Sequence, residues 1–314
     1  PREQKRRPSC IAQNVQRVLR ELSTLSLNES EGTKTMKTLL KLTTQRATYP
    51  ICNTVKIEKN KAFGWDGSIA IITPCDMPDG LYDAHYLKAG AVELSQEDAT
   101  DYKAADSADL VADMVLNVAD LEWVSSAMCK DETRYYLCGI FIRNGGMVAT
   151  NGHTAKFQKA DIKIEEGFIM SDDMVKYILL LADEEKVKEI RVTIDTNKQI
   201  RAYVGQSEVI AQAIDGTYPT IDRVVPEDDK EANFDYAAFK AWFKVNKQIL
   251  ALKDKTYMRV SAALFCDGLD FDIFFNAKLL DITELSGKFG YSEALSAVKI
   301  VNGPRMAVLM PMRA

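Results

Sequence analysis

One order of elements recurs along this chain, a short amphipathic helix followed by strands of alternating hydrophobicity. It is clearest between residues 115 and 230, where Asp120 is predicted to cap a helix that carries Leu121, Val124 and Met128. A strand from 135 to 142 is expected next. No repeat of the sequence itself accompanies this recurrence. Two helices for each antiparallel sheet, used more than once, predict an α+β fold.

The same region carries a strong hairpin signal. Asn144-Gly145 separates two apolar runs, so the strand from 147 to 150 is expected to return antiparallel to the one before it. A second helix should begin after Ser171, a good N-cap, with Asp172 and Asp173 in its first turn. Alternating apolar residues then predict strands at 190–194, 200–204 and 209–214.

The third segment begins with a predicted helix over 235–252. Its apolar face carries Phe239, Trp242, Phe243, Ile249 and Leu250. A second face carries lysines at 240, 244 and 247, at helical spacing. Such a stripe is usually only a solvated face, but it also has the geometry for contacts with phosphates.

Composition excludes several classes of protein. The 314 residues are 46% hydrophobic and 27% charged, as in folded globular proteins, and no apolar run reaches the roughly 18 residues of a membrane span. The six cysteines form no CxxC pair and only two histidines occur, so reduced thiols in the cytoplasm and no metal or cofactor are expected. The net charge of −5 argues against a protein that coats nucleic acid, although it permits a local basic patch.

Residues 1–35 differ from the rest of the chain. A basic run at Arg2, Lys5, Arg6 and Arg7 precedes apolar residues at helical spacing, which predicts an appended amphipathic helix. An organellar transit peptide and an expression artefact also fit this composition, with Met36 as an internal start.

Four separated stretches resemble the beta sliding clamp, the processivity subunit of bacterial DNA polymerase III, in matching order and at similar spacing. They are Arg134 to Gly139, Val148 to His153, Ile214 to Pro219 continuing through Arg223 to Pro226, and Met310 to Arg313. Phe275-Asn276 adds a weaker match before a helix expected at 278–285. Thr48 to Ile51, leading into a strand at 54–58, is the main match in the amino-terminal third.

The resemblance implies a DNA-clamp fold, in which repeated helix-plus-antiparallel-sheet domains form a ring with helices inside and sheets outside. The expected domains are an extension at 1–35 and clamp domains at 36–114, 115–230 and 231–314. The first and third are shorter than the family's nearly equal domains, which suggests a divergent relative such as a phage-encoded one. The implied function is non-enzymatic: the ring encircles duplex DNA without reading its sequence and tethers the replicative polymerase in the cytoplasm. The implied partners are that polymerase, a clamp-loader ATPase and a second copy of the chain, with a trimer as the alternative to a dimer.

In the family, partners insert a short peptide into a pocket between the second and third domains. Residue by residue, the resemblance places this pocket at Leu137, Thr150, Gly152, His153, Thr154, Ala155, Pro219, Arg223, Val224, Val308, Met310, Pro311, Met312 and Arg313. Methionines and small apolar residues suit an adaptable slot for aromatic or aliphatic anchors. Thr154 and Ala155 depart from the Arg-Leu usual there, so the preferred peptide is expected to differ.

Cations on the helices and loops that would face the hole are candidates for DNA contact. The residues are Lys41, Arg46, Lys130, Arg134, Lys176, Lys240, Lys244, Lys247 and Lys278, together with Tyr135 and Tyr136, which match aromatic residues near the hole in the family. Each lysine taken singly also fits an ordinary solubilising surface charge.

Two other classes of function compete with the clamp. Cys138 and His153 could form the nucleophile and base of a hydrolase, although no third orienting residue accompanies them. A sequence-specific DNA reader has no helix-turn-helix or zinc signature to support it. Ser286-Gly287-Lys288 lacks the rest of a phosphate loop, so opening of a ring by ATP hydrolysis would require a separate ATPase.

Overall fold

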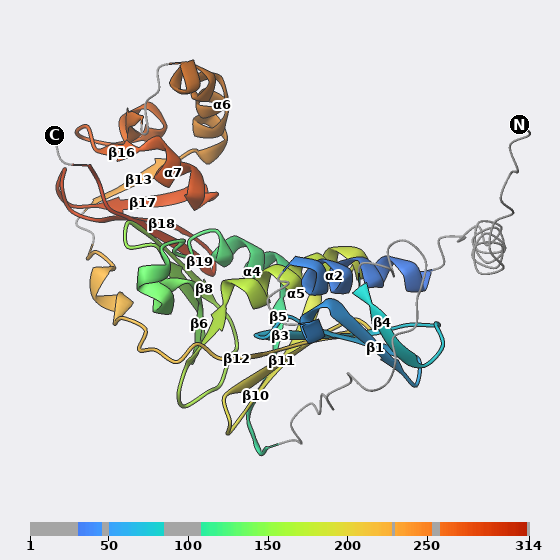
Figure 1. Ribbon diagram of the computed structural model, residues 1–314. Coiled ribbons are helices and arrows are strands. Elements are labelled where there is room, and N and C mark those ends of the chain that lie inside the picture. Colours follow the sequence, from blue (N-terminus) through green and yellow to red (C-terminus); the bar gives the residue numbers. More distant parts are fainter. Residues whose placement is uncertain (1–30, 46–49, 85–107, 228–229, 253–257, 313–314) are drawn as a thin grey trace, which may run out of the picture. The chain divides into compact units, whose positions relative to one another are not determined.

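The computed structural model describes residues 31–45, 50–84, 108–227, 230–252 and 258–312 (Figure 1). The helix predicted near residues 11–22 lies outside these ranges, as do Arg46 and Arg313. The chain divides into two compact units, Pro1–Tyr102 and Lys103–Ala314.

In the described residues of the first unit, one α-helix packs on an antiparallel sheet. Its elements are α2 (Glu31–Gln45), η1 (Pro50–Asn53), β1 (Thr54–Glu58), β2 (Lys61–Trp65), β3 (Ile69–Pro74) and β4 (Gly80–Asp83). The strands lie in the order β4-β1-β2-β3, and β1 is confirmed where the sequence predicts it. Leu39 and Leu42 of α2 are fully buried. The helix comes so close to β2 that a Cβ on Gly64 would lie 2.7 Å from the Thr43 methyl group.

The middle part of the second unit contains one motif twice. The first copy is β5 (Leu110–Asn117), α4 (Val118–Ser125), β6 (Gly139–Arg143), β7 (Gly146–Thr150) and β8 (Thr154–Lys159). The second is β9 (Phe168–Ser171), α5 (Asp172–Glu185), β10 (Glu189–Asp195), β11 (Gln199–Val204) and β12 (Ser207–Gln212). The copies exchange their first strands, because β5 pairs with β10 and β9 pairs with β6. The recurring order of elements is therefore confirmed as a repeat of topology.

The last part of the chain repeats this plan with a reduced first half. It comprises β13 (Lys230–Phe234), α6 (Tyr236–Leu252), β14 (Arg259–Ser261), η5 (Ala262–Leu264) and β15 (Cys266–Asp267), then β16 (Phe274–Asn276), α7 (Ala277–Thr283), β17 (Gly287–Tyr291), β18 (Val298–Asn302) and β19 (Arg305–Leu309). Again the first strands are exchanged, with β13 on β17 and β14 on β16. The strands β14 and β15 have only three and two residues, so the first half of this segment is reduced relative to the second.

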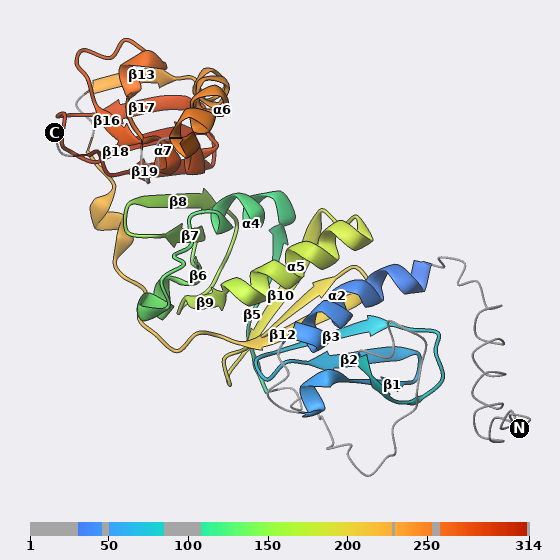
Figure 2. The same ribbon diagram turned by 45° about the horizontal axis from the view of Figure 1, so that its top comes forward.

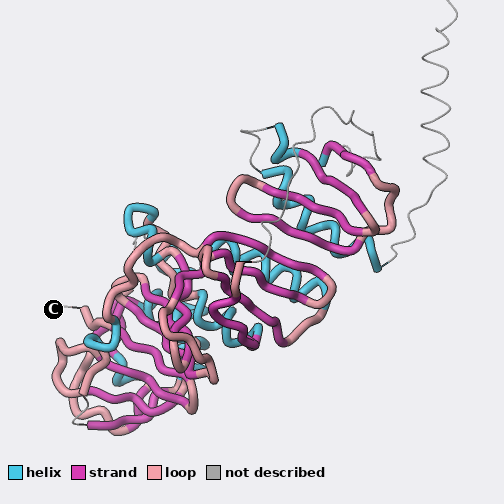
Figure 3. The backbone as a smooth tube through the Cα atoms, turned by 90° about the horizontal axis from the view of Figure 1, so that it is seen from below, coloured by secondary structure: helices cyan, strands magenta, loops and turns pink. Residues whose placement is uncertain are grey.

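Both parts of the second unit share one sheet. Its strand order is β15-β13-β17-β18-β19-β8-β7-β6-β9, so the antiparallel pair β19–β8 joins the middle segment to the last. The helices α4 and α5 pack side by side on the strands, and α6 packs against α7 (Figure 2). The tube drawing, coloured by secondary structure, shows helices lying against strands (Figure 3). We call the β8–β19 strand pair, which joins the middle and last segments, the β8–β19 joint.

Several local predictions are confirmed and two are wrong. Ser171 caps α5, Asn144-Gly145 forms the β6–β7 turn with Gly145 at φ +82°, and Asp235 accepts two amide hydrogen bonds at the start of α6. The cap of α4, however, is Asn117 and not Asp120, because the Asn117 side chain accepts from the amides of residues 119 and 120.

The strand predicted at 135–142 begins only at residue 139. Residues Glu132–Leu137 form the 3₁₀ segment η3 instead, because the Asp131 side chain accepts from the Thr133 amide and hydroxyl groups at 3.1 and 2.7 Å. Local side-chain bonding of this kind competes with strand formation. The helix expected at 278–285 is α7, which Asn276 caps and which ends in left-handed Glu284.

Candidate functional site

The β8–β19 joint brings three distant stretches of the sequence together. Ala155 pairs with Val308 and Thr154 with Leu309 in the sheet, and the Met310 amide donates to the His153 carbonyl at 2.9 Å. Leu137, Ala155 and Val308 belong to one buried hydrophobic cluster with Tyr218 and Ile221. We call the predicted pocket residues around this cluster the candidate peptide site.

The turn between β7 and β8 is fixed by its own polar groups. Asn151 Oδ1 accepts from the amides of His153 and Thr154, both at 2.9 Å, while the Thr150 hydroxyl accepts from the Gly152 amide. Gly152 adopts φ +91°, a conformation that other residues rarely take. The turn therefore leaves Gly152 and His153 exposed above buried Thr154 and Ala155.

A second edge of the site is the segment η4 (Ile221–Val224) with the residues before it. Tyr218 is buried and stacks on Phe141 with ring centroids 4.8 Å apart, and burial raises the pKa of its hydroxyl. Asp222 forms a bidentate ion pair with Arg143, which lowers the pKa of the Asp222 carboxyl group. With Tyr218 and Ile221 anchored inside, Pro219, Arg223 and Val224 are left exposed.

The chain after β19 forms the third edge. The Met312 amide donates to the Phe274 carbonyl at 2.7 Å, so backbone bonds hold this tail at both Met310 and Met312. The Met310 side chain is 44% exposed although it is apolar. Pro311 and Met312 are half-buried.

Apart from half-buried Pro311 and Met312, the predicted site residues that the structure describes are either buried or exposed. The buried ones are Leu137, Thr150, Thr154, Ala155 and Val308, and the exposed ones are Gly152, His153, Pro219, Arg223, Val224 and Met310. Sequence reasoning did not place Tyr218, Ile221 and Phe157 at the site, although all three belong to the buried cluster. The signal for Tyr218 was its position, an aromatic residue directly before Pro219.

Thr154 contributes to the site mainly through its backbone. Its carbonyl accepts from the Thr150 hydroxyl at 2.9 Å, while its own hydroxyl is buried without a hydrogen-bond partner among the described residues. The small buried side chains of Thr154 and Ala155 mean that neither reaches out from the site.

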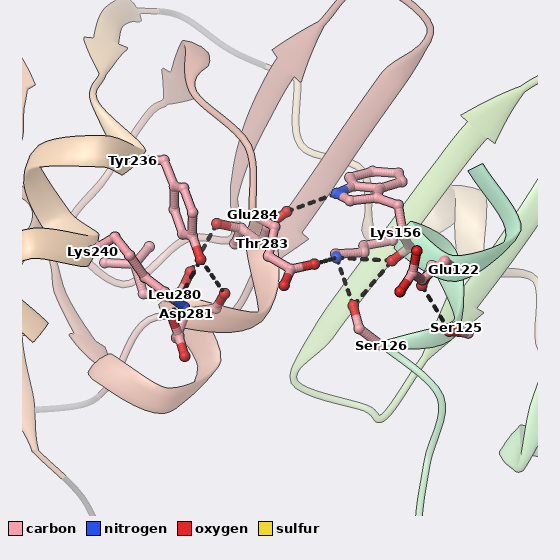
Figure 4. Close-up of polar contacts among 11 residues, drawn as sticks. Glu122, Ser125, Ser126, Lys156, Tyr236, Lys240, Leu280, Asp281, Thr283 and Glu284 are labelled. Atoms are coloured by element: carbon pink, nitrogen blue, oxygen red, sulfur yellow. Dashed lines mark hydrogen bonds and ion pairs between the residues drawn. The ribbon is translucent and has the colours of Figure 1, made fainter. Parts of the chain in front are cut away.

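Several candidate DNA contacts are engaged within the chain. Lys240 forms an ion pair of 2.6 Å with Asp281 and lies near the Tyr236 ring (Figure 4). Arg134 pairs with Asp131 at 3.2 Å and donates to the Asn151 carbonyl, which places it beside the turn at Gly152. Lys176 lies 3.9 Å from Asp173.

Other candidate cations extend into solvent. Exposed Lys41, Lys130, Lys244, Lys247 and Lys278 form no ion pair with another residue that the structure describes. Lys244 and Lys247 lie on α6, and the Lys247 ammonium is 5.9 Å from the Phe243 ring centroid. Tyr135 is 53% exposed, whereas Tyr136 packs on the buried cluster of the candidate peptide site.

Solved structures of bacterial sliding clamps match almost the whole length of this chain. A clamp from Bartonella birtlesii bound to griselimycin is 18% identical with a TM-score of 0.72, and the match covers 90% of this chain and 96% of that one. A griselimycin-bound clamp from Pseudomonas aeruginosa is 18% identical with a TM-score of 0.71, and the match covers 90% of this chain and 96% of that one. The beta subunit of DNA polymerase III from Thermotoga maritima is 15% identical with a TM-score of 0.68, and the match covers 89% of this chain and 98% of that one.

The chain has the sliding-clamp fold. The fold that the sequence resemblance implies is thereby confirmed, although no protein-family model and no curated protein matches the sequence. Within this fold, the middle and last segments each contain the repeated motif with exchanged first strands.

Cys138, the nucleophile of the alternative hydrolase hypothesis, lies in an environment that does not activate a thiol. The Cys138 sulfur faces the carbonyls of Asp131 and Arg134, and burial raises the pKa of the thiol. A nucleophilic cysteine needs the opposite shift, since the thiolate is the reactive form.

Within the described ranges, no group of three His, Cys, Asp or Glu side chains is arranged to hold a metal ion. The described helices include none with the length and apolarity of a membrane span.

Proposed function

We propose that the chain is a DNA sliding clamp, a non-enzymatic tether that encircles duplex DNA and holds a replicative polymerase on it. The observation that carries this proposal is a likeness to beta clamps that spans 90% of this chain and 96% of the clamps from Bartonella birtlesii and Pseudomonas aeruginosa. A shared domain alone would leave most of one chain unmatched. The site of action would be replicating DNA in the cytoplasm.

A clamp acts by topology, which suits the charge of this chain. A closed ring stays on DNA without a tight grip, so a protein with a net charge of −5 can serve if scattered cations face the phosphates. Exposed Lys244 and Lys247 on α6, with Lys41, Lys130 and Lys278, are the proposed contacts. Loading would require a separate clamp-loader ATPase to open the ring.

The candidate peptide site is the proposed docking point for the polymerase. The exposed Met310 side chain, next to the buried apolar cluster, offers an adaptable contact to aromatic or aliphatic anchors. Exposed Arg223 would fix a carboxylate or carbonyl group of the bound peptide. Because Thr154 and Ala155 are small and buried, the preferred anchor near β8 is expected to differ from that of clamps with Arg-Leu at these positions.

The assembly is the first test. The purified protein should form a closed dimer, since three-domain subunits close a six-domain ring by twofold symmetry. Native mass spectrometry and sizing by light scattering at micromolar concentration would measure this. Three subunits would retain the clamp but remove the dimer, and a strictly monomeric protein would contradict the proposal.

The lysines on α6 provide a second prediction, sharpened by the ion pair at Lys240. Changing Lys244 and Lys247 together to Glu should slow loading onto DNA several-fold at low salt and leave the melting temperature unchanged, because both side chains are exposed. Lys240→Glu should instead lower the melting temperature, since it places a carboxylate beside Asp281. Loading kinetics and thermal melting measure the two effects.

A matched control is Lys186→Glu, which alters an exposed lysine paired locally with Asp183 after α5. It should have a smaller effect on loading than the α6 pair. Equal loading by all variants would remove α6 from the proposed DNA surface.

A further inference from the structure

A lysine lies fully buried in the β8–β19 joint. The Lys156 side chain has no exposed surface, and its ammonium donates to three acceptors. These are the Trp123 carbonyl at 2.9 Å, the Ser126 hydroxyl at 2.6 Å and Glu284 Oε2 at 3.3 Å (Figure 4). The ammonium also lies 4.5 Å from the Trp123 ring centroid. Since an ammonium has three N–H donors, the site satisfies the charged form completely.

The partners of Lys156 come from both sides of the joint. Trp123 and Ser126 belong to α4 and its end in the middle segment, whereas Glu284 ends α7 in the last segment. Trp123 crosses the joint as well, because its indole N–H donates to the Thr283 carbonyl at 3.0 Å. Opening the joint would therefore break the Lys156–Glu284 and Trp123–Thr283 contacts and uncover the side of Lys156 that faces α7, while the bonds of Lys156 to Trp123 and Ser126 stay within the middle segment.

Other charges around Lys156 largely offset one another. Arg305 on β19 repels the Lys156 ammonium. Its guanidinium lies 5.0 Å from the centroid of the Trp123 ring, which Lys156 also contacts. Asp120 on α4 forms a 2.6 Å ion pair with Arg305. Glu284 is 48% exposed, so solvent screens its attraction for the ammonium, and Glu122 on the same helix as Asp120 is exposed too.

We propose that the β8–β19 joint is proton-linked: Lys156 releases a proton more readily when the joint is closed and takes one up when it opens. Burial disfavours the ammonium more than Glu284 favours it, which lowers the pKa of Lys156 to about 8 from an ordinary value near 10.4. An opened joint would admit water to the side chain, which keeps only its Trp123 and Ser126 contacts, and would raise its pKa toward that ordinary value. The inference concerns the joint itself and does not rest on the proposed clamp function.

The sign of the linkage follows from the lowered pKa. Between about pH 8 and pH 10 the closed joint binds fewer protons than the open one, so closure is favoured as pH rises through this window. Below the window both states carry the charge, and the closed joint bears the full cost of burying it. A rise from about pH 7.5 to about pH 9.5 should lower the opening constant, roughly twentyfold for a full return to the ordinary pKa.

Hydrogen exchange followed by mass spectrometry on the full chain tests this. After correction for the pH dependence of intrinsic exchange, the protection of peptides from α4 and α7 should rise by up to roughly twentyfold between these pH values. Lys156→Met fills the same space without a charge and should lose this rise. The Trp123 carbonyl keeps a donor in that variant, the Ser126 hydroxyl at 3.0 Å.

Two further variants complete the experiment. Glu284→Gln removes the counter-charge, so it should reduce protection at about pH 7.5 and move the transition to lower pH. Lys288→Met, at an exposed lysine paired with Glu231, is the matched control and should keep the wild-type response. Protection of the wild type that stays constant or falls with pH would overturn the proposal, and so would an unchanged response in Lys156→Met.

Discussion

Once loaded on circular duplex DNA, the protein is expected to remain bound at about 1 M salt and to dissociate when the circle is cut. At that ionic strength the Debye length is about 3 Å, so contacts between lysines and phosphates are largely screened. A linkage between two closed rings does not depend on charge. Gel filtration of the loaded DNA before and after linearisation measures the retained protein.

The Lys244→Glu and Lys247→Glu double variant is the useful control for this result. If those lysines assist loading only, the fraction that does load should be retained on the circle as well as the wild type. Equal loss of protein from circular and linear DNA at high salt would contradict encirclement, whatever the state of assembly.

The second large effect is expected at Met310. Replacing its exposed side chain with Ser should weaken polymerase binding by about 1–3 kcal/mol, roughly ten- to a hundredfold, because apolar anchors concentrate binding energy in such sites. The backbone bond from Met310 to His153 survives this change, so the fold should persist. Deleting residues 310–314 should abolish binding altogether and leave ring assembly intact. Pull-down of the cognate polymerase and the product lengths in primer extension measure both.

Leu295→Ser is the matched control for Met310→Ser. Leu295 is also an exposed apolar residue, 59% accessible, but it lies between β17 and β18 and outside the candidate peptide site. It should leave processive synthesis unchanged. Equal processivity in the wild type, Met310→Ser and the deletion would exclude the site as the docking point. A measurable hydrolytic turnover that His153→Ala abolishes would instead support an enzyme.

The sequence predicted the elements whose signals are local. The strand at 54–58, the cap at Ser171 and the turn at Asn144-Gly145 each depend on a few adjacent residues. The cap at Asn117 was missed because Asp120, three residues later, is an equally good cap by type. Propensity alone does not decide between such neighbours.

The features that sequence reasoning could not supply depend on distant partners. From the sequence, Lys156 would be interpreted as an ordinary surface lysine in an alternating strand. Its burial depends on Trp123 and Glu284, which are distant in the sequence. Lys240 was interpreted as a free cation because nothing nearby indicates its pairing with Asp281. For the candidate peptide site, the resemblance identified the convergent stretches, whereas the buried support from Tyr218 and Ile221 required the structure.

The exchange of first strands also constrains how the middle segment can be made by a ribosome. β5 has its described partner in β10, so it must wait until residues 189–195 have emerged before it can pair. Until then β5 is unpaired and carries Leu110, Val111 and Val115, apolar side chains that stay exposed in the folded chain, so the nascent strand is prone to associate with other chains. Neither half of the segment is a self-sufficient folding unit, because each half contributes a strand to the other's sheet. A split protein cut between β8 and β9 would therefore be expected to fold only when both fragments are present together.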